Sequence, residues 1–418
     1  MPAGKLARTW LSVVVVLAIL VAANASWAAG KLRILHTFTS GDGAAPNGDG
    51  PLAFDSSGNL YGTTGTGGSG SGCGGGCGTV FQLRPTSSGW TESVLYNFSN
   101  NGDSAYGPQF GVSLDTAGNL YGTASFGAPS CGTIFQLVPN FGGGWTENIL
   151  HAFNPNNIPG DACNPSSALV SDAAGNLYGL TSSGGTYGEG AAFELTAISG
   201  GAWSYSVIYS FGAQFGDSGG PSGNLALDGA GDLFGTSLSG GFYGVGTVFR
   251  LSLTSAGWTG TVIYDFTGGD NGQYPEAGVT FDPQGNLYGT TYGGGADAVG
   301  VVYQLKPTRR GFWTLHVIHS FTGNNDGGHP SFGSLAIDGK GSLYGETLYG
   351  GFYGYGAVFE LMKPTTGRGF ETVLHSFANG PDGENPSGGL IFDPAGNLYG
   401  TVPTGGASGY GIVFEVIP

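Results

Sequence analysis

The sequence contains few charged residues, and basic residues are the scarcer kind. Charged residues make up 10% of the 418 positions, with 12 Lys and Arg against 28 Asp and Glu, so the formal net charge is −16. A chain this acidic is repelled by phosphate backbones and by anionic lipid surfaces. The composition therefore argues against nucleic acid as a partner, and the low charged content argues against a charged disordered tail.

Long apolar runs are also missing, apart from one near the N-terminus. Leu11–Ala22 is apolar and uncharged, and Lys5 and Arg8 precede it. Two possible cleavage sites with small residues follow, Ala23-Asn24-Ala25 and Ser26-Trp27-Ala28. This order of features is typical of a secretory signal peptide, and the run is short for a bilayer span. An uncleaved N-terminal anchor is the alternative.

We therefore predict a signal peptide over residues 1–28 and one mature domain over residues 29–418. Residues 1–28 hold two basic and no acidic residues, so cleavage changes the formal charge to −18. The expected location is secreted or periplasmic, with no stable membrane insertion after cleavage. No cysteine directly follows the apolar run, so a lipid anchor is not expected.

Cysteine is rare, and its setting predicts disulfides. The chain contains Cys73, Cys77, Cys131 and Cys163. An even number of cysteines in an exported chain is typical of paired thiols. No histidine stands beside them, so the sequence gives little support for a zinc site made by these cysteines.

Glycine, in contrast, is abundant and periodic. The chain has 85 Gly and 21 Pro, and the glycines recur at a fixed phase between aromatic and β-branched runs. The segment Asn59-Leu60-Tyr61-Gly62-Thr63 marks the repeat, and its aromatic residue returns at intervals of 54 to 60 residues. The seven copies of this aromatic residue are Tyr61, Tyr121, Tyr178, Phe234, Tyr288, Tyr344 and Tyr399. This period is a little longer than that of kelch and WD40 blades, and it leaves room for four strands with long loops.

Each repeat contains four short runs with the composition of β-strands. In the first repeat they are residues 52–54, 59–64, 79–83 and 90–98. Asp55 opens the turn between the first two runs, and Asp, Pro and Gly at its equivalents are typical turn residues. We interpret the seven aspartates of this turn as structural. The repeats predict an all-β fold, a seven-bladed β-propeller with four-stranded blades.

The two ends of the chain predict how the ring closes. Leu35-His36-Thr37-Phe38 repeats the end of a fourth run, although no first three runs precede it. The last repeat stops after its third run, residues 412–416. The N-terminal strand is therefore expected to complete the last blade, which removes the free sheet edges.

The motifs are similar to those of a known family. The phrase Phe-Asp-Pro-x-Gly-Asn-Leu-Tyr-Gly-Thr, followed by a glycine-rich stretch and Gly-Thr-Val-Phe-x-Leu, resembles the GloVer tandem repeat of exported bacterial proteins. The resemblance extends over essentially the whole mature chain and implies no established reaction. The Asp-x-x-Gly-Asn-Leu-Tyr turn also resembles that of NHL-type propellers.

Propeller geometry indicates which loops could carry a binding site. The second-to-third and fourth-to-first loops share one face, and here these loops are long and glycine-rich. Function is expected on such loops, because the sheets hold them rigidly. Aromatic rings on them offer flat apolar surfaces to sugars. The candidate ligand-binding residues are Tyr187, Tyr243, Tyr292, Tyr353 and Tyr410. The alternative is that these rings pack between blades.

The same reasoning suggests a disulfide pairing. Cys131 falls in a second-to-third loop and Cys163 in the next fourth-to-first loop, on the same face. Cys73 and Cys77 enclose three glycines. Among the three possible pairings we prefer Cys73–Cys77 with Cys131–Cys163.

The fourth-to-first loops also repeat an aspartate. One hypothesis is metal binding, with Ca²⁺ expected because it prefers oxygen ligands. The other is repeated turn geometry, which we favour because no loop supplies the full ligand series of an EF-hand. The aspartates are Asp42, Asp103, Asp161, Asp217, Asp270, Asp326 and Asp382. No other cofactor is expected.

The regularity of the repeats favours binding over catalysis. Near-identical units build a platform and leave little chemistry that is specific to one unit. The expected function is an exported, non-catalytic binding or scaffolding protein, a monomer, with a glycan or an extracellular protein as its partner. The alternative is a propeller enzyme, a lyase or glycoside hydrolase, acting on polysaccharide at the channel mouth. A purely structural extracellular role is a third possibility.

Overall fold

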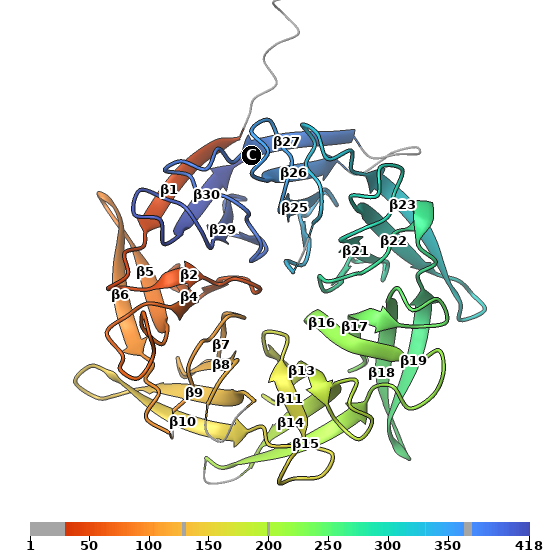
Figure 1. Ribbon diagram of the computed structural model, residues 1–418, viewed down its shortest axis with the longest axis horizontal. Coiled ribbons are helices and arrows are strands. Elements are labelled where there is room, and N and C mark those ends of the chain that lie inside the picture. Colours follow the sequence, from red (N-terminus) through yellow and green to blue (C-terminus); the bar gives the residue numbers. More distant parts are fainter. Residues whose placement is uncertain (1–29, 103, 128–130, 199–200, 331, 363–369) are drawn as a thin grey trace, which may run out of the picture.

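The computed structural model describes residues 30–418 except 103, 128–130, 199–200, 331 and 363–369, so the predicted signal peptide lies outside it. Seven antiparallel sheets stand in a ring around a common centre (Figure 1). In the described part of the chain the one helical element is the 3-10 turn η1 (Gly269–Asn271). The predicted all-β, seven-bladed propeller is confirmed.

The blades follow one another along the chain. Blade 1 contains β2 (Ala44–Pro46), β3 (Ala53–Phe54), β4 (Leu60–Thr66), β5 (Thr79–Thr86) and β6 (Gly89–Asn97). Blade 2 contains β7 (Val112–Leu114), β8 (Leu120–Ala124), β9 (Thr133–Pro139) and β10 (Trp145–Ala152). Blade 3 contains β11 (Ala162–Pro165), β12 (Val170–Ser171), β13 (Leu177–Gly184), β14 (Ala191–Ala197) and β15 (Trp203–Ser210). Blade 4 contains β16 (Ser218–Leu227), β17 (Leu233–Gly240), β18 (Thr247–Thr254) and β19 (Gly257–Asp265).

The remaining three blades complete the ring. Blade 5 contains β20 (Thr280–Phe281), β21 (Leu287–Thr291), β22 (Val301–Pro307) and β23 (Trp313–Ser320). Blade 6 contains β24 (Ala336–Ile337), β25 (Leu343–Thr347), β26 (Ala357–Met362) and β27 (Phe370–Ser376). Blade 7 contains β28 (Ile391–Phe392), β29 (Leu398–Val402), β30 (Ile412–Ile417) and the N-terminal strand β1 (Lys31–Thr37).

The ring closes as the ends of the sequence predict. Strand β1 runs antiparallel to β30, with Lys31 opposite Ile417 and Thr37 opposite Ile412; β1 lies at the rim and β30 lies beside it on the inner side (Figure 1). Blade 7 therefore combines the first and last strands of the domain.

The turn between the first two strands has the predicted structural role. Asp55 Oδ1 accepts hydrogen bonds from the backbone N–H groups of Ser57 and Asn59, at 2.8 and 2.9 Å. Its Oδ2 accepts from Asn59 Nδ2 at 2.7 Å and from the Tyr61 hydroxyl at 3.0 Å. In all seven blades this aspartate accepts from the N–H groups two and four residues later. The motif is an Asx turn that also orients the repeated tyrosine.

The innermost part of each blade, which the sequence predicted as one short strand, is more irregular in the structure. In blade 1 both β2 and β3 pair with β4, and residues 47–52 leave the ladder between them. The break follows an x-Pro step at which the residue before proline has positive φ, as at Ala45 with φ 53°. This is unusual, because a residue before proline favours extended backbone. The conformation recurs in all seven blades, at Ala45, Gly107, Asn164, Gly220, Tyr274, His329 and Asn385.

These x-Pro steps join neighbouring blades. The N–H of Asn385 in blade 7 donates to the carbonyl of Tyr355 in blade 6 at 2.9 Å, and the same bond forms at each of the other six junctions. The following proline packs on the glycine that precedes the third strand of the preceding blade, as Pro386 does on Gly356. That glycine's carbonyl in turn accepts the N–H of the phenylalanine ending the fourth strand, Phe377, at 3.0 Å. Each junction is thus fixed by backbone geometry.

The apolar core lies between the blades. The phenylalanine that ends each fourth strand is fully buried and contacts an aromatic ring of the next blade's third strand. The Phe38–Phe81 centroids are 5.0 Å apart, and the Phe321–Phe359 centroids 5.2 Å, both edge to face. Such pairs add to the stabilisation that burial itself provides.

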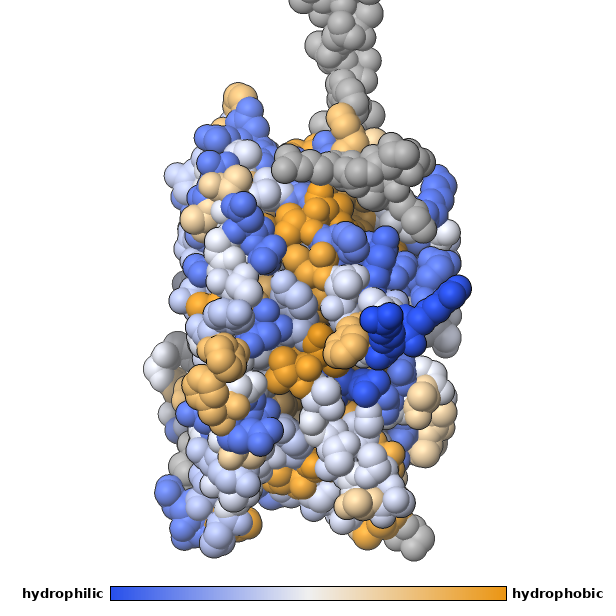
Figure 2. Space-filling model, turned by 90° about the vertical axis from the view of Figure 1, so that its right-hand side faces the viewer, coloured by the Kyte–Doolittle hydropathy of each residue, from blue (hydrophilic) through white to orange (hydrophobic). Residues whose placement is uncertain are grey.

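The outer wall of the ring is mixed in polarity. Figure 2 shows a broken band of apolar residues flanked by hydrophilic ones. The burial pattern of β23, which alternates exposed and half-buried positions, agrees with this surface. No helix in the described residues has the length and apolarity needed to span a bilayer.

Candidate functional site

Four of the five candidate tyrosines lie exposed in second-to-third loops. Tyr187, Tyr243 and Tyr353 occupy the same loop position in blades 3, 4 and 6, and their exposed fractions are 53%, 57% and 56%. Tyr410 lies in the corresponding loop of blade 7, near its end, and is 41% exposed. These rings are available to a ligand, because little of the protein covers them.

At blades 3 and 4 the exposed rings form a cluster. Phe215, in the loop between β15 and β16, is 82% exposed and lies edge to face with Phe242, with centroids 5.2 Å apart. Phe242 in turn contacts Tyr243 at 5.7 Å. Tyr187 lies beside Gly212, at the start of the loop that carries Phe215. We call the three contacting rings Phe215, Phe242 and Tyr243, together with Tyr187 beside the same loop, the aromatic patch.

Sequence reasoning missed Phe215. It stands between the repeated phenylalanine and the loop aspartate, where the other six repeats have no aromatic residue, so its signal was an aromatic residue found in one repeat only. A matched loop exists in blade 6, where Phe352 and Tyr353 contact each other at 5.0 Å. The fourth-to-first loop beside that pair carries Asn, Asp and Gly, with no aromatic residue equivalent to Phe215.

Tyr292 has a different environment from the other four. It is half-buried, and its ring lies 4.5 Å from that of His329, whose Nδ1 is 3.1 Å from the Tyr292 carbonyl oxygen. Burial raises the pKa of Tyr292, and the neighbouring Tyr349 and Glu276 raise it further. Tyr292 therefore belongs to an inner group of side chains and not to the exposed loop tips.

Two carboxylates near this inner group have raised pKa values. Burial raises the pKa of Asp49 to about 6. Burial also raises the pKa of Glu276 to about 7, and the charge of Asp49 contributes. Asp49 lies between β2 and β3 and Glu276 precedes β20, so the two come from the inner segments of blades on opposite sides of the ring (Figure 1). We call them the inner acidic pair.

Sequence reasoning singled out neither member of this pair. A signal existed for Glu276, which directly follows the repeated proline. The other six repeats place a neutral polar residue there: Asn47, Gln109, Ser166, Ser222, Ser331 and Ser387. Residues with pKa values shifted toward neutrality can exchange protons near pH 7, which makes the pair a possible acid–base site.

Five aspartates of the fourth-to-first loops accept backbone N–H groups of their own loops, namely Asp42, Asp161, Asp217, Asp326 and Asp382. Asp161 accepts from the N–H groups of Asn154 and Ala162, both at 2.8 Å, and from the Tyr205 hydroxyl at 2.9 Å. Asp217, Asp326 and Asp382 also accept backbone N–H groups of their loops. Asp270 lies in η1, and Asp103 is outside the described residues. No cluster of three possible metal ligands in the described residues contains two of these aspartates.

The same five aspartates face a repeated His or Tyr on the fourth strand. His375 Nε2 lies 3.1 Å from Asp382, and the Tyr209 hydroxyl donates to both oxygens of Asp217 at 3.1 Å. Burial lowers the pKa of His375, although Asp382 opposes the shift. The pairs explain why Tyr and His alternate at this repeat position, since both rings can donate to the same carboxylate.

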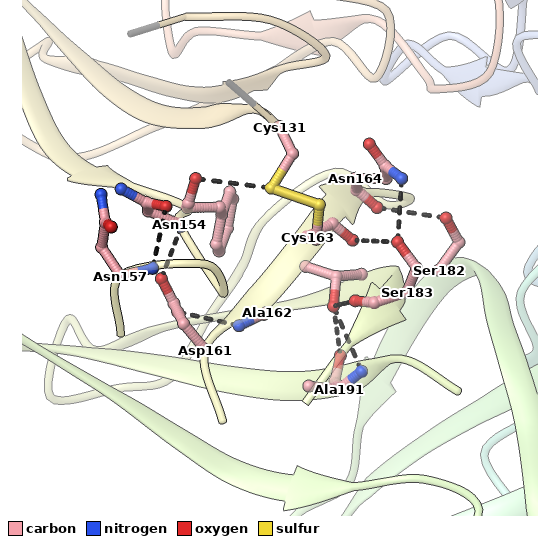
Figure 3. The surroundings of a disulfide bond; sticks show 12 residues. Cys131, Asn154, Asn157, Asp161, Ala162, Cys163, Asn164, Ser182, Ser183 and Ala191 are labelled. Carbon is pink, nitrogen blue, oxygen red and sulfur yellow. Dashed lines mark hydrogen bonds between the residues drawn. A yellow bond between two sulfur atoms is a disulfide. The ribbon is translucent and has the colours of Figure 1, made fainter. Parts of the chain in front are cut away.

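The two predicted disulfides are present. Cys73 and Cys77 pair within one loop of blade 1, and Cys131 and Cys163 pair with their Cα atoms 5.3 Å apart. Figure 3 shows the second bond crossing from the β8–β9 loop to β11, beside Asp161. It therefore links blades 2 and 3. Two disulfides are compatible with an oxidising, extracellular or periplasmic compartment.

Comparison with known proteins supports the fold. A family model described as the Gloeobacter/Verrucomicrobia repeat matches residues 111–324 and 313–418. A comparison with curated proteins gives no match.

Three solved structures are similar in architecture. An ancestral GH74 enzyme is 14% identical with a TM-score of 0.51, over 88% of this chain and 50% of that one. A putative 6-phosphogluconolactonase from Bacteroides uniformis is 14% identical with a TM-score of 0.49, over 82% and 89%. A putative oxidoreductase (glucose dehydrogenase) from Thermus thermophilus is 15% identical with a TM-score of 0.45, over 93% and 99%. At 14% identity, the similarity to the ancestral GH74 enzyme shows a shared fold alone. No conclusion is drawn from the other two structures, whose TM-scores are below 0.5.

Proposed function

We propose that this chain, which belongs to the Gloeobacter/Verrucomicrobia repeat family, is an exported carbohydrate-binding propeller without catalytic activity. The observation that carries the proposal is the aromatic patch, in which loops of two neighbouring blades present rings to solvent. Phe215 and Phe242 are 82% and 65% exposed and contact each other. Clustered exposed rings mark interaction sites on soluble proteins.

The chemistry of the patch favours sugars over other ligands. Ring faces stack on the C–H groups of pyranoses, while the hydroxyl groups of Tyr187 and Tyr243 can hydrogen-bond to sugar oxygens. The net charge of −16 repels acidic polymers. We therefore expect a neutral glycan, bound by a monomer in the periplasm or outside the cell.

The first experiment is affinity electrophoresis of the purified protein in gels containing a neutral β-glucan, a xylan or a galactomannan. Removing both rings of the Phe215–Phe242 contact with Phe215→Ala/Phe242→Ala should weaken binding by about 2 kcal/mol, or about 30-fold in Kd, because central interface aromatics cost at least that much on truncation.

Blade 6 supplies the matched control. Phe352→Ala/Tyr353→Ala also removes two exposed rings, but from a loop without a Phe215 equivalent, and it should leave retention close to wild type. Equal losses in both variants would show that the patch is not the site. If none of the three polysaccharides retards the wild-type protein, the neutral-glycan proposal is wrong.

One observation favours a second candidate, a polysaccharide-cleaving enzyme. The inner acidic pair could supply the acid and the base that glycoside cleavage requires. The same polysaccharides are therefore incubated with the protein and assayed for new reducing ends. Product that is abolished in both Asp49→Asn and Glu276→Gln, with retention in the gel unchanged, would replace the non-catalytic proposal with this one.

A further inference from the structure

The junctions between blades bring together three repeat positions, two on the fourth strands of neighbouring blades and one on the loop between these blades. The first is the His or Tyr of a fourth strand, and the second is the aspartate of the loop that follows. The third comes from the next blade, four residues before that blade's own His or Tyr. At the junction of blades 7 and 1 these residues are His36, Asp42 and Glu92; at the junction of blades 5 and 6 they are His319, Asp326 and Glu371.

In these two junctions the side chains can converge on one point. Each residue offers a nitrogen or carboxylate oxygen, and in each trio these atoms lie within 4.8 Å of one another. His36 Nε2 is 3.2 Å from Asp42 Oδ2. His319 Nε2 is 3.5 Å from Asp326 Oδ2 and 3.9 Å from Glu371 Oε2. The side chains are partly buried, with exposed fractions between 13% and 23% for the five that form these contacts.

The glutamates at these junctions lack the partners that an equivalent glutamate has. Glu147 occupies the same repeat position between blades 1 and 2, and both of its oxygens are satisfied. Its Oε2 accepts the Tyr96 hydroxyl at 3.0 Å, and its Oε1 accepts the Ala105 N–H at 3.1 Å. In contrast, the buried Oε1 atoms of Glu92 and Glu371 have no hydrogen-bond partner.

His319 Nε2 is also buried without a hydrogen bond. No lysine or arginine pairs with the four carboxylates of the two trios among the residues that the structure describes. Each trio therefore places two carboxylates beside one imidazole with no protein cation to balance them. A buried polar atom without a partner is energetically unfavourable, and each such atom in a native structure needs an explanation. A bound ion that supplies the missing partner is such an explanation.

We infer that each of these two trios binds a Zn²⁺ ion. One nitrogen and two carboxylate oxygens form a three-ligand set that leaves a fourth position for water, which suits tetrahedral zinc. The imidazole disfavours Ca²⁺ and Mg²⁺, which take oxygen ligands. The ion would give His319 Nε2 a partner and would balance the two carboxylates of each trio.

The location of the trios gives the ions a structural role. His36 and Asp42 belong to the N-terminal segment that closes the ring, and Glu92 belongs to β6 of blade 1. An ion at this junction joins the closing segment to the first blade. The second ion joins blades 5 and 6 in the same manner. Because the ligands come from different blades, zinc binding should stabilise the closed ring.

The sequence contains natural controls for this inference. The junction of blades 6 and 7 has His375 and Asp382 but Leu32 at the third position, so it holds two ligands only. Glu92→Leu and Glu371→Leu convert each trio to that composition, with a residue that the fold already accepts there. Glu147→Leu removes a glutamate from the same repeat position at a junction whose fourth-strand residue is Tyr96.

The test is the zinc content of the purified protein after equilibration with Zn²⁺ at pH 7 and gel filtration. We expect two ions per chain in the wild type and in Glu147→Leu, one in each single variant and none in Glu92→Leu/Glu371→Leu. Removing a ligand should weaken its site on the order of 100-fold or more, since loss of even an outer partner costs 10- to 100-fold.

Circular dichroism checks that each variant is folded, and the isosteric Glu92→Gln and Glu371→Gln pair repeats the measurement if a leucine variant is not. Absorption of the Co²⁺-loaded protein should show tetrahedral bands that disappear with the same substitutions. A wild type without bound zinc, or a folded double variant that still holds two ions, would overturn the inference.

Discussion

Replacing Gly356 by alanine should destabilise the ring by about 3–5 kcal/mol, while the same change at Gly354, two residues earlier in the same loop, should cost about 1–2 kcal/mol. Gly356 has φ 96° and Gly354 has φ 87°, so an alanine is strained at both positions. Because the backbone strain is similar in both variants, the difference between their free energies of unfolding measures the effect of the steric contacts.

Those contacts are made at Gly356 and not at Gly354. A Cβ at Gly356 would meet the Thr347 carbonyl oxygen, and it would lie 2.7 Å from Pro386 Cδ of the next blade. At Gly354 no atom lies within 4 Å of the added carbon. Neither partner at Gly356 can yield easily, because one is backbone and the other is a rigid proline ring.

Thermal unfolding measures this prediction. For a domain of this length a change of 3–5 kcal/mol corresponds to roughly 4–6 °C in Tm. Gly300→Ala, which makes the same kind of contacts with Pro330 one junction earlier, should reproduce the Gly356→Ala result. Similar Tm values for the Gly354 and Gly356 variants would show that the proline contact does not hold the blades in register.

Raising the pH from 5 to 9 should destabilise the wild-type protein through Glu346, and Glu346→Gln should remove that part of the loss. Glu346 stands on β25, where five of the other repeats have threonine. Its side chain is buried, with Oε2 accepting the Gly389 N–H at 2.9 Å and Oε1 unpaired. Burial raises the pKa of Glu346 to about 8, and the Gly389 hydrogen bond offsets only part of this rise.

The direction of this change in stability with pH follows from how many protons the folded and unfolded states bind. In the unfolded chain this carboxyl loses its proton near the ordinary glutamate pKa of 4.5, whereas in the folded protein it keeps the proton until about pH 8. Between these values the folded state binds more protons, so stability falls as pH rises, and it stays low above pH 8. The full shift corresponds to at most about 5 kcal/mol.

The measurement is Tm at pH 5, 7 and 9 for the wild type and Glu346→Gln. The two proteins should differ most at pH 9, where the variant is expected to be more stable by several degrees. Other buried carboxyls such as Asp49 and Glu276 titrate in the same range, so the comparison is between proteins at each pH. Glu384→Gln, at a partly exposed loop position, serves as the control and should follow the wild type. Parallel curves for wild type and Glu346→Gln would contradict the prediction.

Much of the architecture could be read from local sequence. Seven copies of the Asn-Leu-Tyr-Gly phrase predicted seven blades, and the displaced Leu-His-Thr-Phe segment predicted the pairing of β1 with β30. The Asp-x-x-Gly turn was interpreted as structural, and its hydrogen bonds confirm this. The disulfide pairing also followed, because loop order places Cys131 and Cys163 on one face.

The candidate sites depended on contacts that no single repeat contains. From the sequence, exposure was only an expectation for Tyr187, Tyr243, Tyr353 and Tyr410. The sequence also grouped Tyr292 with these residues, although it lies among inner side chains. Phe215 meets Phe242 across two blades, and Asp49 affects Glu276 from the far side of the ring. Nothing in the sequence distinguished Glu92 and Glu371, because their neighbours from the preceding blade are known only from the structure.

The sequence by itself thus determined the number of blades, their order, the closure of the ring and the tight turns, because each of these depends on a pattern within one repeat or on its period. The tertiary structure alone decided which rings form the aromatic patch, which carboxylates are buried and which His, Asp and Glu side chains share a junction. The physical reason is that these properties arise where one blade packs on the next, and desolvation and ligand geometry there are set by residues that belong to different repeats.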